Sequence, residues 1–326
     1  NSLDERLLIA RRLVAERCLY GVDMNPLAVE LAKLSIWLIT LAKGRPFGFL
    51  DHNLRSGDSL LGIHDLKQIY CFDLHANEKT SKKLFAQKMD EQVNEALALR
   101  KKLRDVPIRD IQDVQYMERL DKQARQKLER IEHIADAIIG EALASGGKEK
   151  AMDTSMQALS EWSSAYIEGN DETGNKIIAN ARKALSTDLP SGKAPRKPFH
   201  WALEFPEVFE RGGFDGIVGN PPFIGGRRIS YRLGNSYFAF IKQALNSAVA
   251  TTDLCVYFLR RAYLLIGCQK CLGFLLSDIV SQGDSRESGL LYVLQNGGTI
   301  FNAIPSRHWP GAAGVKIAQV HIFKGS

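Results

Sequence analysis

Residues 214–223 read Phe-Asp-Gly-Ile-Val-Gly-Asn-Pro-Pro-Phe. The first six residues form a short, mainly apolar run that predicts a buried strand, and Asn220 stands where this strand ends. Pro221 and Pro222 lack a backbone N–H and have a fixed φ, so the chain continues neither as a strand nor as an ordinary helix. We therefore expect a rigid loop whose amide and carbonyl oxygens accept hydrogen bonds from an amino group. Phe223 offers a flat face for stacking, so the loop predicts a site for a planar ring with an exocyclic amine.

The composition is that of an ordinary globular protein. The chain has 326 residues, of which 45% are hydrophobic and 25% charged, enough for one large domain and an added segment. No apolar run approaches the roughly 18 residues of a membrane span, and the charged amino end does not fit a signal peptide. We therefore expect a cytoplasmic protein that does not enter a membrane.

Charge and cysteine content narrow the chemistry only a little. The net charge of +6 permits a polyanionic partner but does not require one. The five cysteines are scattered, which predicts no disulfide framework. Cys268 and Cys271 form a lone Cys-x-x-Cys pair without a second pair of ligands nearby, so we expect no metal site.

The pattern of apolar residues divides the chain into three parts. Residues 1–78 begin with a helix, a short strand and a second helix, which is the first part of an α/β core. Residues 79–198 form a helical insertion with a long amphipathic helix over 111–138. Its first two helices carry more basic than acidic residues, which fits either a solvated helical hairpin or a basic arm over a nucleic-acid backbone. Residues 199–326 resume the α/β core.

The alternation of strands and helices predicts the fold class. It favours an α/β protein with a mostly parallel sheet covered on both faces. The last two strands, 299–303 and 317–323, are too close in sequence for a crossover helix, so we expect an antiparallel pair at one edge of the sheet. The apolar residues 69–74 predict one further strand in the first part of the core.

Three polar residues are expected at the carboxyl ends of strands, where open parallel sheets bind ligands. These residues are Asp23, Asp58 and Asn220. An acid at the end of the second strand of a nucleoside-binding sheet accepts hydrogen bonds from ribose hydroxyls. Nicotinamide-dependent dehydrogenases use the same device, but they need a Gly-x-Gly-x-x-Gly turn about 20 residues earlier, and the sequence contains none there.

Taken together, these segments resemble the adenine-N6 DNA methyltransferases of restriction-modification and related phage-defence systems, the group with an Asn-Pro-Pro-Phe or Asn-Pro-Pro-Tyr loop. The similar segments are 20–38 and 54–62, which resemble the family's second and third motifs, 199–209 before the loop, 253–262 and 273–277 after it, and Trp309-Pro-Gly311 near the end. The resemblance covers 1–62 and 199–326. It implies a Rossmann-like methyltransferase sheet interrupted by the helical insertion.

The resemblance also implies a cofactor and a role for several residues. The cofactor is S-adenosylmethionine. Asp23 is expected to bind its ribose hydroxyls, Met24 to pack against its adenine, and Asp58 to accept a hydrogen bond from the adenine amino group. Phe258 is expected either to wall the same pocket or to belong to the core.

The implied substrate is double-stranded DNA with one adenine flipped out of the helix. Asn220 and the carbonyl of Pro221 are expected to accept hydrogen bonds from the amino group of that adenine, in a loop held rigid by Pro222, while Phe223 stacks on the ring. These acceptors orient the lone pair of the amine toward the methyl donor, so catalysis is mainly positioning and electrostatics.

Two arginines follow the loop directly. Arg227 and Arg228 are expected either to contact DNA phosphates or to be solvated.

One element of the family pattern is absent from the sequence. The Gly-rich first motif should precede Asp23, and residues 1–20 contain no glycine. The target-recognition domain expected after the methylase core is not found either. The resemblance thus implies a piece of a larger enzyme, whose other parts include an N-terminal segment, a nuclease and a target-recognition domain. We expect the piece alone to bind the cofactor weakly.

Two alternatives remain open. Enzymes that methylate a glutamine side chain of release factors use the same loop, although the large insertion and the Trp309-Pro-Gly311 segment do not fit those compact proteins. The chain is alternatively a non-catalytic DNA-binding or assembly module that keeps the fold.

Overall fold

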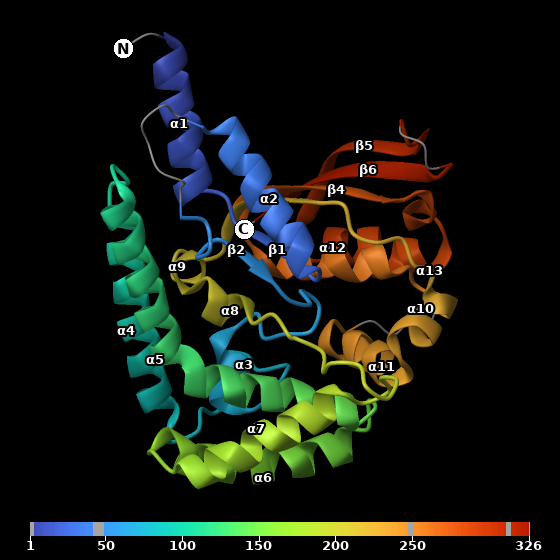
Figure 1. Cartoon of the computed structure of the whole chain (residues 1–326). Coiled ribbons are helices and arrows are strands. Elements are labelled where there is room, and N and C mark those ends of the chain that lie inside the picture. The colour runs from blue at the N-terminus through green and yellow to red at the C-terminus, as the bar shows by residue number, and fades with distance from the viewer. Residues whose placement is uncertain (1–2, 42–48, 247–250, 311–313, 326) are drawn as a thin grey trace.

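The computed structural model describes residues 3–41, 49–246, 251–310 and 314–325. The chain folds into a mixed α/β core flanked by a large helical insertion (Figure 1). The first part of the core consists of α1 (Leu3–Arg17), β1 (Gly21–Asp23), α2 (Pro26–Ile39), β2 (Leu54–Ser56) and α3 (Leu66–Cys71). The helical insertion consists of α4 (Ala86–Asp105), α5 (Ile111–Ala144), α6 (Glu149–Ile167) and α7 (Asp171–Leu185).

The second part of the core holds the remaining strands. Its elements before the longest strand are α8 (Trp201–Glu204), α9 (Pro206–Phe209), β3 (Phe214–Gly219), α10 (Gly226–Leu233), α11 (Asn235–Ala244) and α12 (Leu254–Leu265). They are followed by β4 (Ile266–Ser277), the 3₁₀-helix η1 (Asp278–Ser281), α13 (Gly283–Arg286), the π-helix η2 (Glu287–Leu291), α14 (Tyr292–Gln295), β5 (Gly298–His308) and β6 (Lys316–Lys324). Gly311 of the Trp309-Pro-Gly311 segment lies outside the described residues.

The strands form two sheets. β1 and β2 pair in parallel, and the second sheet has the order β3-β4-β6-β5. β3 and β4 are parallel, whereas β6 is antiparallel to both β4 and β5. The expected antiparallel edge pair is therefore present as β5 and β6. Antiparallel pairing is more extensive than the sequence predicts, because β6 lies between β4 and β5 and two of the four described ladders are antiparallel.

The strand expected over 69–74 is wrong, because residues 69–71 end α3 and residues 72–74 follow it in a turn. Asp65 caps this helix: its carboxylate accepts a hydrogen bond from the backbone N–H of Lys67, and the Gln68 side chain bonds back to the N–H of Asp65. This capping box satisfies N–H groups at the start of α3 and favours a helix in this segment.

The hydrophobic core consists mainly of two clusters, one centred on the helical insertion and one on the sheet. The larger one joins the helical insertion to α3 and α11. The smaller one lies between α12 and strands β4 and β6, and Figure 1 shows α12 beneath these strands. The long amphipathic helix predicted over 111–138 is confirmed as α5, which extends to Ala144. No helix in the described residues is long and apolar enough to span a membrane.

The helical insertion is tied to the core by buried ion pairs. Arg100 of α4 donates to both carboxylate oxygens of Glu207, Nε at 2.6 Å and Nη2 at 2.8 Å. Tyr20, just before β1, donates to Glu207 at 3.1 Å and accepts from Arg104 at 2.7 Å. These contacts fix α4 against the start of β1, so the insertion is not a freely solvated hairpin.

Candidate active site

A cavity of about 670 Å³ lies between β1 and β3. Its wall comprises residues 18–24, 57–59, Trp201, Phe214, 216–222, Phe258, 261–262, Leu265 and Phe274. The rings of Tyr20 and Phe214, which precede β1 and begin β3, lie 5.8 Å apart. The two strands thus start at the same end of the cavity. Seven residues singled out in the sequence line it together: Asp23, Met24, Asp58, Asn220, Pro221, Pro222 and Phe258.

Asp23 is held at the carboxyl end of β1 by a tight turn. Its carboxylate accepts a hydrogen bond from the backbone N–H of Asn25 at 2.7 Å, and its carbonyl accepts one from Gly57 at 3.0 Å. Asn25 in turn caps α2, where Pro26 occupies the first helical position. Asp23 and Met24 are both solvent-exposed, so their side chains are accessible to a ligand in the cavity.

Asp58 is buried and strongly hydrogen-bonded on one side. Its Oδ1 accepts from the N–H groups of Leu60 and Leu61 at 3.0 and 3.3 Å and from the Tyr237 hydroxyl at 3.2 Å. No described residue donates to Oδ2. Burial raises the pKa of Asp58 above its ordinary value, although the three hydrogen bonds act in the opposite direction.

The segment before α8 packs against Asp58 and the residues that follow it. Phe199 donates its N–H to the carbonyl of Leu61 at 2.7 Å and to that of Asp58 at 3.2 Å. A Cβ on Gly62 would lie 1.9 Å from the Phe199 carbonyl oxygen, so only glycine permits this approach. Trp201 donates from its indole to the carbonyl of Ser59 at 3.0 Å. The lead-in segment noted in the sequence therefore shapes the cavity.

Two residues of α12 complete the wall near Asp58. Phe258 is partly buried, and Arg261 follows it by three residues on the same helix face. Arg261 is 2% exposed, and its Nη2 donates to the Leu60 carbonyl at 3.1 Å. Burial lowers the pKa of Arg261 to about 10, so it stays charged at neutral pH. Arg261 was not predicted from the sequence, although its helical spacing from Phe258 was a usable signal.

The Asn-Pro-Pro-Phe loop reaches the cavity with three of its four residues. Asn220 and Pro222 are exposed, and Pro221 is buried. The preceding Gly219 is required by close packing, because a Cβ there would lie 2.7 Å from the Phe274 ring. Phe223 is not part of the cavity wall. It is partly buried and packs against the cluster formed by α12 and the sheet.

Arg227 and Arg228 lie in the first turn of α10, outside the cavity wall. Both are exposed, and among the described residues neither guanidinium forms an ion pair or hydrogen bond. Their charges are thus available at the surface close to the loop.

Comparison with protein families identifies the chain as a restriction-modification methylase domain. The matching model is described as Eco57I restriction-modification methylase and covers residues 17–288. The chain belongs to this family.

Two known proteins are similar over part of their length. A protein of Methanocaldococcus jannaschii named "Putative type II restriction enzyme and methyltransferase RM.MjaORFECS2P" is 27% identical over 216 residues, which is 63% of this chain. The chain spans only 18% of that relative's length. The structure of the type IIL restriction-modification enzyme MmeI in complex with DNA matches 74% of this chain and 34% of that chain. Its sequence identity is 18% and its TM-score 0.31, a likeness too weak for aligning the two sites.

Proposed function

We propose that this chain is the catalytic portion of an enzyme that transfers a methyl group from S-adenosylmethionine to the N6 amine of adenine in DNA. The observation that carries the proposal is the shared cavity. It joins Asp23, Met24 and Asp58 on one side to Asn220 and Pro221 on the other. Residues with the chemistry to hold a nucleoside thus face residues with the chemistry to hold an amine. Membership of a restriction-modification methylase family supports DNA as the substrate.

The cavity fits such a cofactor in size and in chemistry. Its volume of about 670 Å³ lies in the range of pockets for drug-sized ligands. Asp23 is exposed in the cavity wall, where its carboxylate is able to accept hydrogen bonds from ribose hydroxyls. Oδ2 of Asp58 is free to accept a hydrogen bond from an amino group. When bound, the cofactor supplies an electrophilic methyl group on sulfur. The protein's part is to bind and orient both reactants.

The loop positions the target base. The amide oxygen of Asn220 and the carbonyl of Pro221 accept the two N–H bonds of the adenine amine, which leaves its lone pair directed at the methyl group. No strong base is required, because the proton is lost after the nitrogen has become cationic. The base reaches this loop only when it is flipped out of the duplex. Stacking on Phe223 requires its ring to turn away from the core contact that it makes in this structure.

Arg227 and Arg228 are proposed to bind phosphates beside the flipped adenine. Their exposure, and the absence of carboxylate partners among the described residues, leave both charges available to DNA. Each such contact adds affinity that falls with rising salt but carries no sequence information.

We also propose that polypeptide beyond this chain completes the cofactor site. β1 pairs only with β2, and β3 only with β4, so each has one open edge beside the cavity among the described residues. Val218 of β3 belongs to the cavity wall and is 91% exposed, which is unusual for an apolar strand residue. A segment with the first motif would cover it. Calorimetry checks this: we expect affinity for S-adenosylmethionine weaker than micromolar with the chain alone, and sub-micromolar affinity of the chain alone would contradict it.

The test of the function is methyl transfer by the parent polypeptide to unmethylated DNA. With tritium-labelled S-adenosylmethionine, we expect Asn220→Ala to reduce labelling at least about 100-fold. Asn94→Ala, in the exposed part of α4, serves as the matched control and should keep full activity. Equal labelling by the Asn220→Ala variant would exclude the proposed role of Asn220.

The same assay separates the two alternatives. If the unmodified parent labels no DNA, the result favours a non-catalytic DNA-binding or assembly module. If it labels a glutamine-containing release-factor peptide instead of DNA, the result favours protein methylation.

A further inference from the structure

Arg261 carries hydrogen-bond donors that the protein does not use. Its side chain is 2% exposed and forms part of the cavity wall. Nη2 donates to the carbonyl of Leu60 at 3.1 Å, whereas Nε and Nη1 have no hydrogen-bond partner among the described residues. Buried donors of a charged group without partners are costly. Arg261 is a residue of the cavity wall, so a ligand in the cavity is one source of the missing acceptor atoms.

The position of Arg261 relative to Asp58 restricts the chemistry of that ligand. The carboxylate of Asp58 accepts a hydrogen bond from the N–H of Leu60 at 3.0 Å, and the guanidinium of Arg261 donates one to the carbonyl of the same residue at 3.1 Å. A free carboxylate acceptor and free guanidinium donors are thus anchored to a single residue. A carboxylate or phosphate ligand that paired with Arg261 would lie near the negative charge of Asp58, which opposes its binding.

A planar ring with an amino group next to a ring nitrogen meets both requirements. Such a ring donates from its amine to Asp58 and accepts at the ring nitrogen from Arg261. Phe258, one helical turn before Arg261 on the same face of α12, lines the same cavity and offers an apolar surface to the ring.

We propose that Arg261 binds the adenine ring of the cofactor by donating a hydrogen bond from Nε or Nη1 to a ring nitrogen. This nitrogen lies beside the amino group from which Asp58 accepts a hydrogen bond. The inference rests on the proposed function, since it takes the cofactor to be an adenosine derivative. Arg261 is then a ligand-binding residue that distinguishes adenine from rings with a donor at that position.

The test compares the affinity of the chain and of its Arg261→Met variant for S-adenosylhomocysteine, measured by ligand-observed NMR, which detects weak binding. We expect the variant to bind at least about tenfold more weakly. Arg260→Met is the matched control, because Arg260 is equally buried but donates to the Ser288 carbonyl and stacks on Tyr292 outside the cavity. This control should keep the affinity of the unmodified chain.

Stability separates a binding role from a structural one. Replacing a buried, incompletely paired charge by an apolar side chain of similar length is often neutral or stabilising. We therefore expect the ligand-free Arg261→Met variant to melt at a temperature no lower than that of the unmodified chain. A lower melting temperature with unchanged affinity would overturn the proposal and assign Arg261 a purely structural role.

Ring-substituted ligands identify the acceptor. In three analogues of S-adenosylhomocysteine, N1, N3 or N7 is replaced in turn by C–H. The N1 or the N7 analogue should bind the unmodified chain at least about tenfold more weakly, and this penalty should vanish in Arg261→Met, as in a double-mutant cycle. Equal penalties in both proteins for every analogue would overturn the proposal.

The failure of this inference is distinguishable from failure of the proposed function. If the unmodified chain and the parent polypeptide both fail to bind S-adenosylhomocysteine, the cofactor assignment falls and this inference with it. If the unmodified chain binds and Arg261→Met binds equally well, only the role of Arg261 is rejected.

Discussion

At the scale of single residues, two charged side chains of the site, Asp58 and Arg261, are buried. Asp58 accepts three hydrogen bonds at one oxygen and none at the other among the described residues, and Arg261 donates from one of its three nitrogens while the other two have no partner there. Burial raises the pKa of Asp58 and lowers that of Arg261, because it disfavours the charged form of both side chains in the free protein. A ligand that pairs with them recovers part of this cost.

Glu132 of α5 should make stability depend on pH. Burial, followed by repulsion from Glu204, raises the pKa of Glu132 from 4.5 to about 7. The folded chain therefore keeps this proton to a higher pH than the unfolded chain, and the free energy of unfolding falls as pH rises from 4.5 to about 7. Because its surface is partly accessible, we expect Glu132→Gln to be more stable than the unmodified chain at pH 8 by at most about 2 kcal/mol.

Urea unfolding at several pH values measures this effect. Well below pH 4.5 the two proteins should unfold alike, since Glu132 is then protonated in both states. The exposed Glu129→Gln is the control and should show no such trend. A stability difference between Glu132→Gln and the unmodified chain that is the same at both ends of the pH range would contradict the assignment.

The residues of the site were predictable from the sequence to different degrees. Asp23, Asp58 and Asn220 stand at strand ends, a position that periodicity reveals, and the structure brings all three to one cavity. The unused donors of Arg261 were not predictable, because they follow from the packing of α12 against the residues after β2. Nor was the half-buried position of Phe223.

At the scale of elements, long helices and the strand before the loop follow the sequence closely because their periodic patterns are unambiguous. The strand expected over 214–219 is β3, and the long helix expected over 111–138 is α5. Short elements are less predictable: α3 depends on a capping box rather than on periodicity. The packing of α4 against the core was not predictable from the sequence either, because nothing in the sequence distinguishes the buried Arg100 from a solvated arginine.

The buried pair between α4 and α9 should dominate the attachment of the insertion. Arg100 and Glu207 are 4% and 3% exposed at their side chains. We expect Arg100→Met to lower the free energy of unfolding by about 3–5 kcal/mol, because it leaves the carboxylate of Glu207 buried with less compensation. The adjacent pair of Lys101 and Glu210 is exposed at 54% and 42%, so Lys101→Met should cost at most about 1 kcal/mol.

Chemical denaturation of both variants provides the comparison, and the double variant Arg100→Met/Glu207→Gln should recover part of the loss. If Arg100→Met and Lys101→Met were equally stable, the insertion would not depend on the buried pair.

Gly62 should be the least replaceable glycine near the site. A Cβ there would lie 1.9 Å from the carbonyl oxygen of Phe199, and the backbone of that segment also bonds to Asp58. We expect Gly62→Ala to cost at least about 2 kcal/mol of unfolding free energy. Gly225→Ala is the control, because nothing lies within 4 Å of a Cβ at that position. Thermal melts that show no difference between the two variants would refute the close approach.

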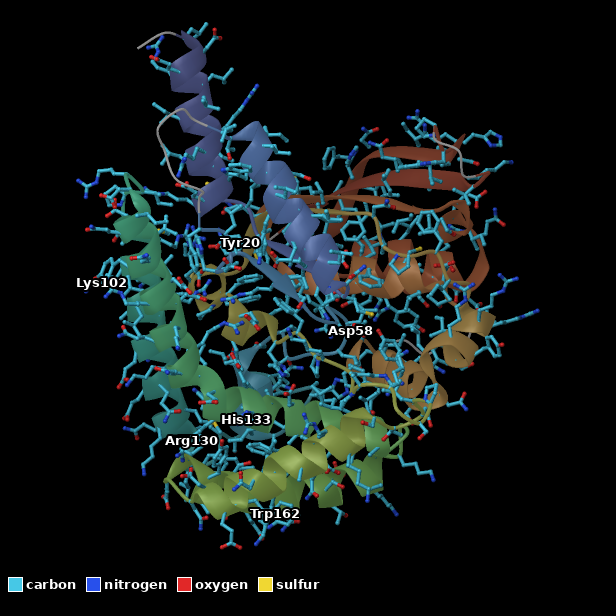
Figure 2. All side chains as sticks on the ribbon, in the orientation of Figure 1. Tyr20, Asp58, Lys102, Arg130, His133 and Trp162 are labelled. Carbon is cyan, nitrogen blue, oxygen red and sulfur yellow. The ribbon has the colours of Figure 1, made fainter. Side chains whose placement is uncertain are left out.

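At the scale of the whole molecule, the cavity lies between two separate sheets and not beyond the end of a continuous one. Within the described residues, β1 and β3 each have one unpaired edge. Figure 2 shows Tyr20 and Asp58 within the core, while Lys102 and Trp162 lie on the outside of the helical insertion. The sequence predicts the α/β class and the insertion. It does not predict the division of the sheet, because strand order depends on contacts between segments far apart in the chain.

The central claim is that the cavity directs methyl transfer to the amine of adenine. The most direct test is mass spectrometry of the nucleosides released from DNA after incubation with the parent polypeptide and S-adenosylmethionine. We expect N6-methyladenine as the methylated base, and its absence when Asn220 is replaced by alanine. Methylation of cytosine instead of adenine, or N6-methyladenine formed equally by the Asn220→Ala variant, would refute the proposed function.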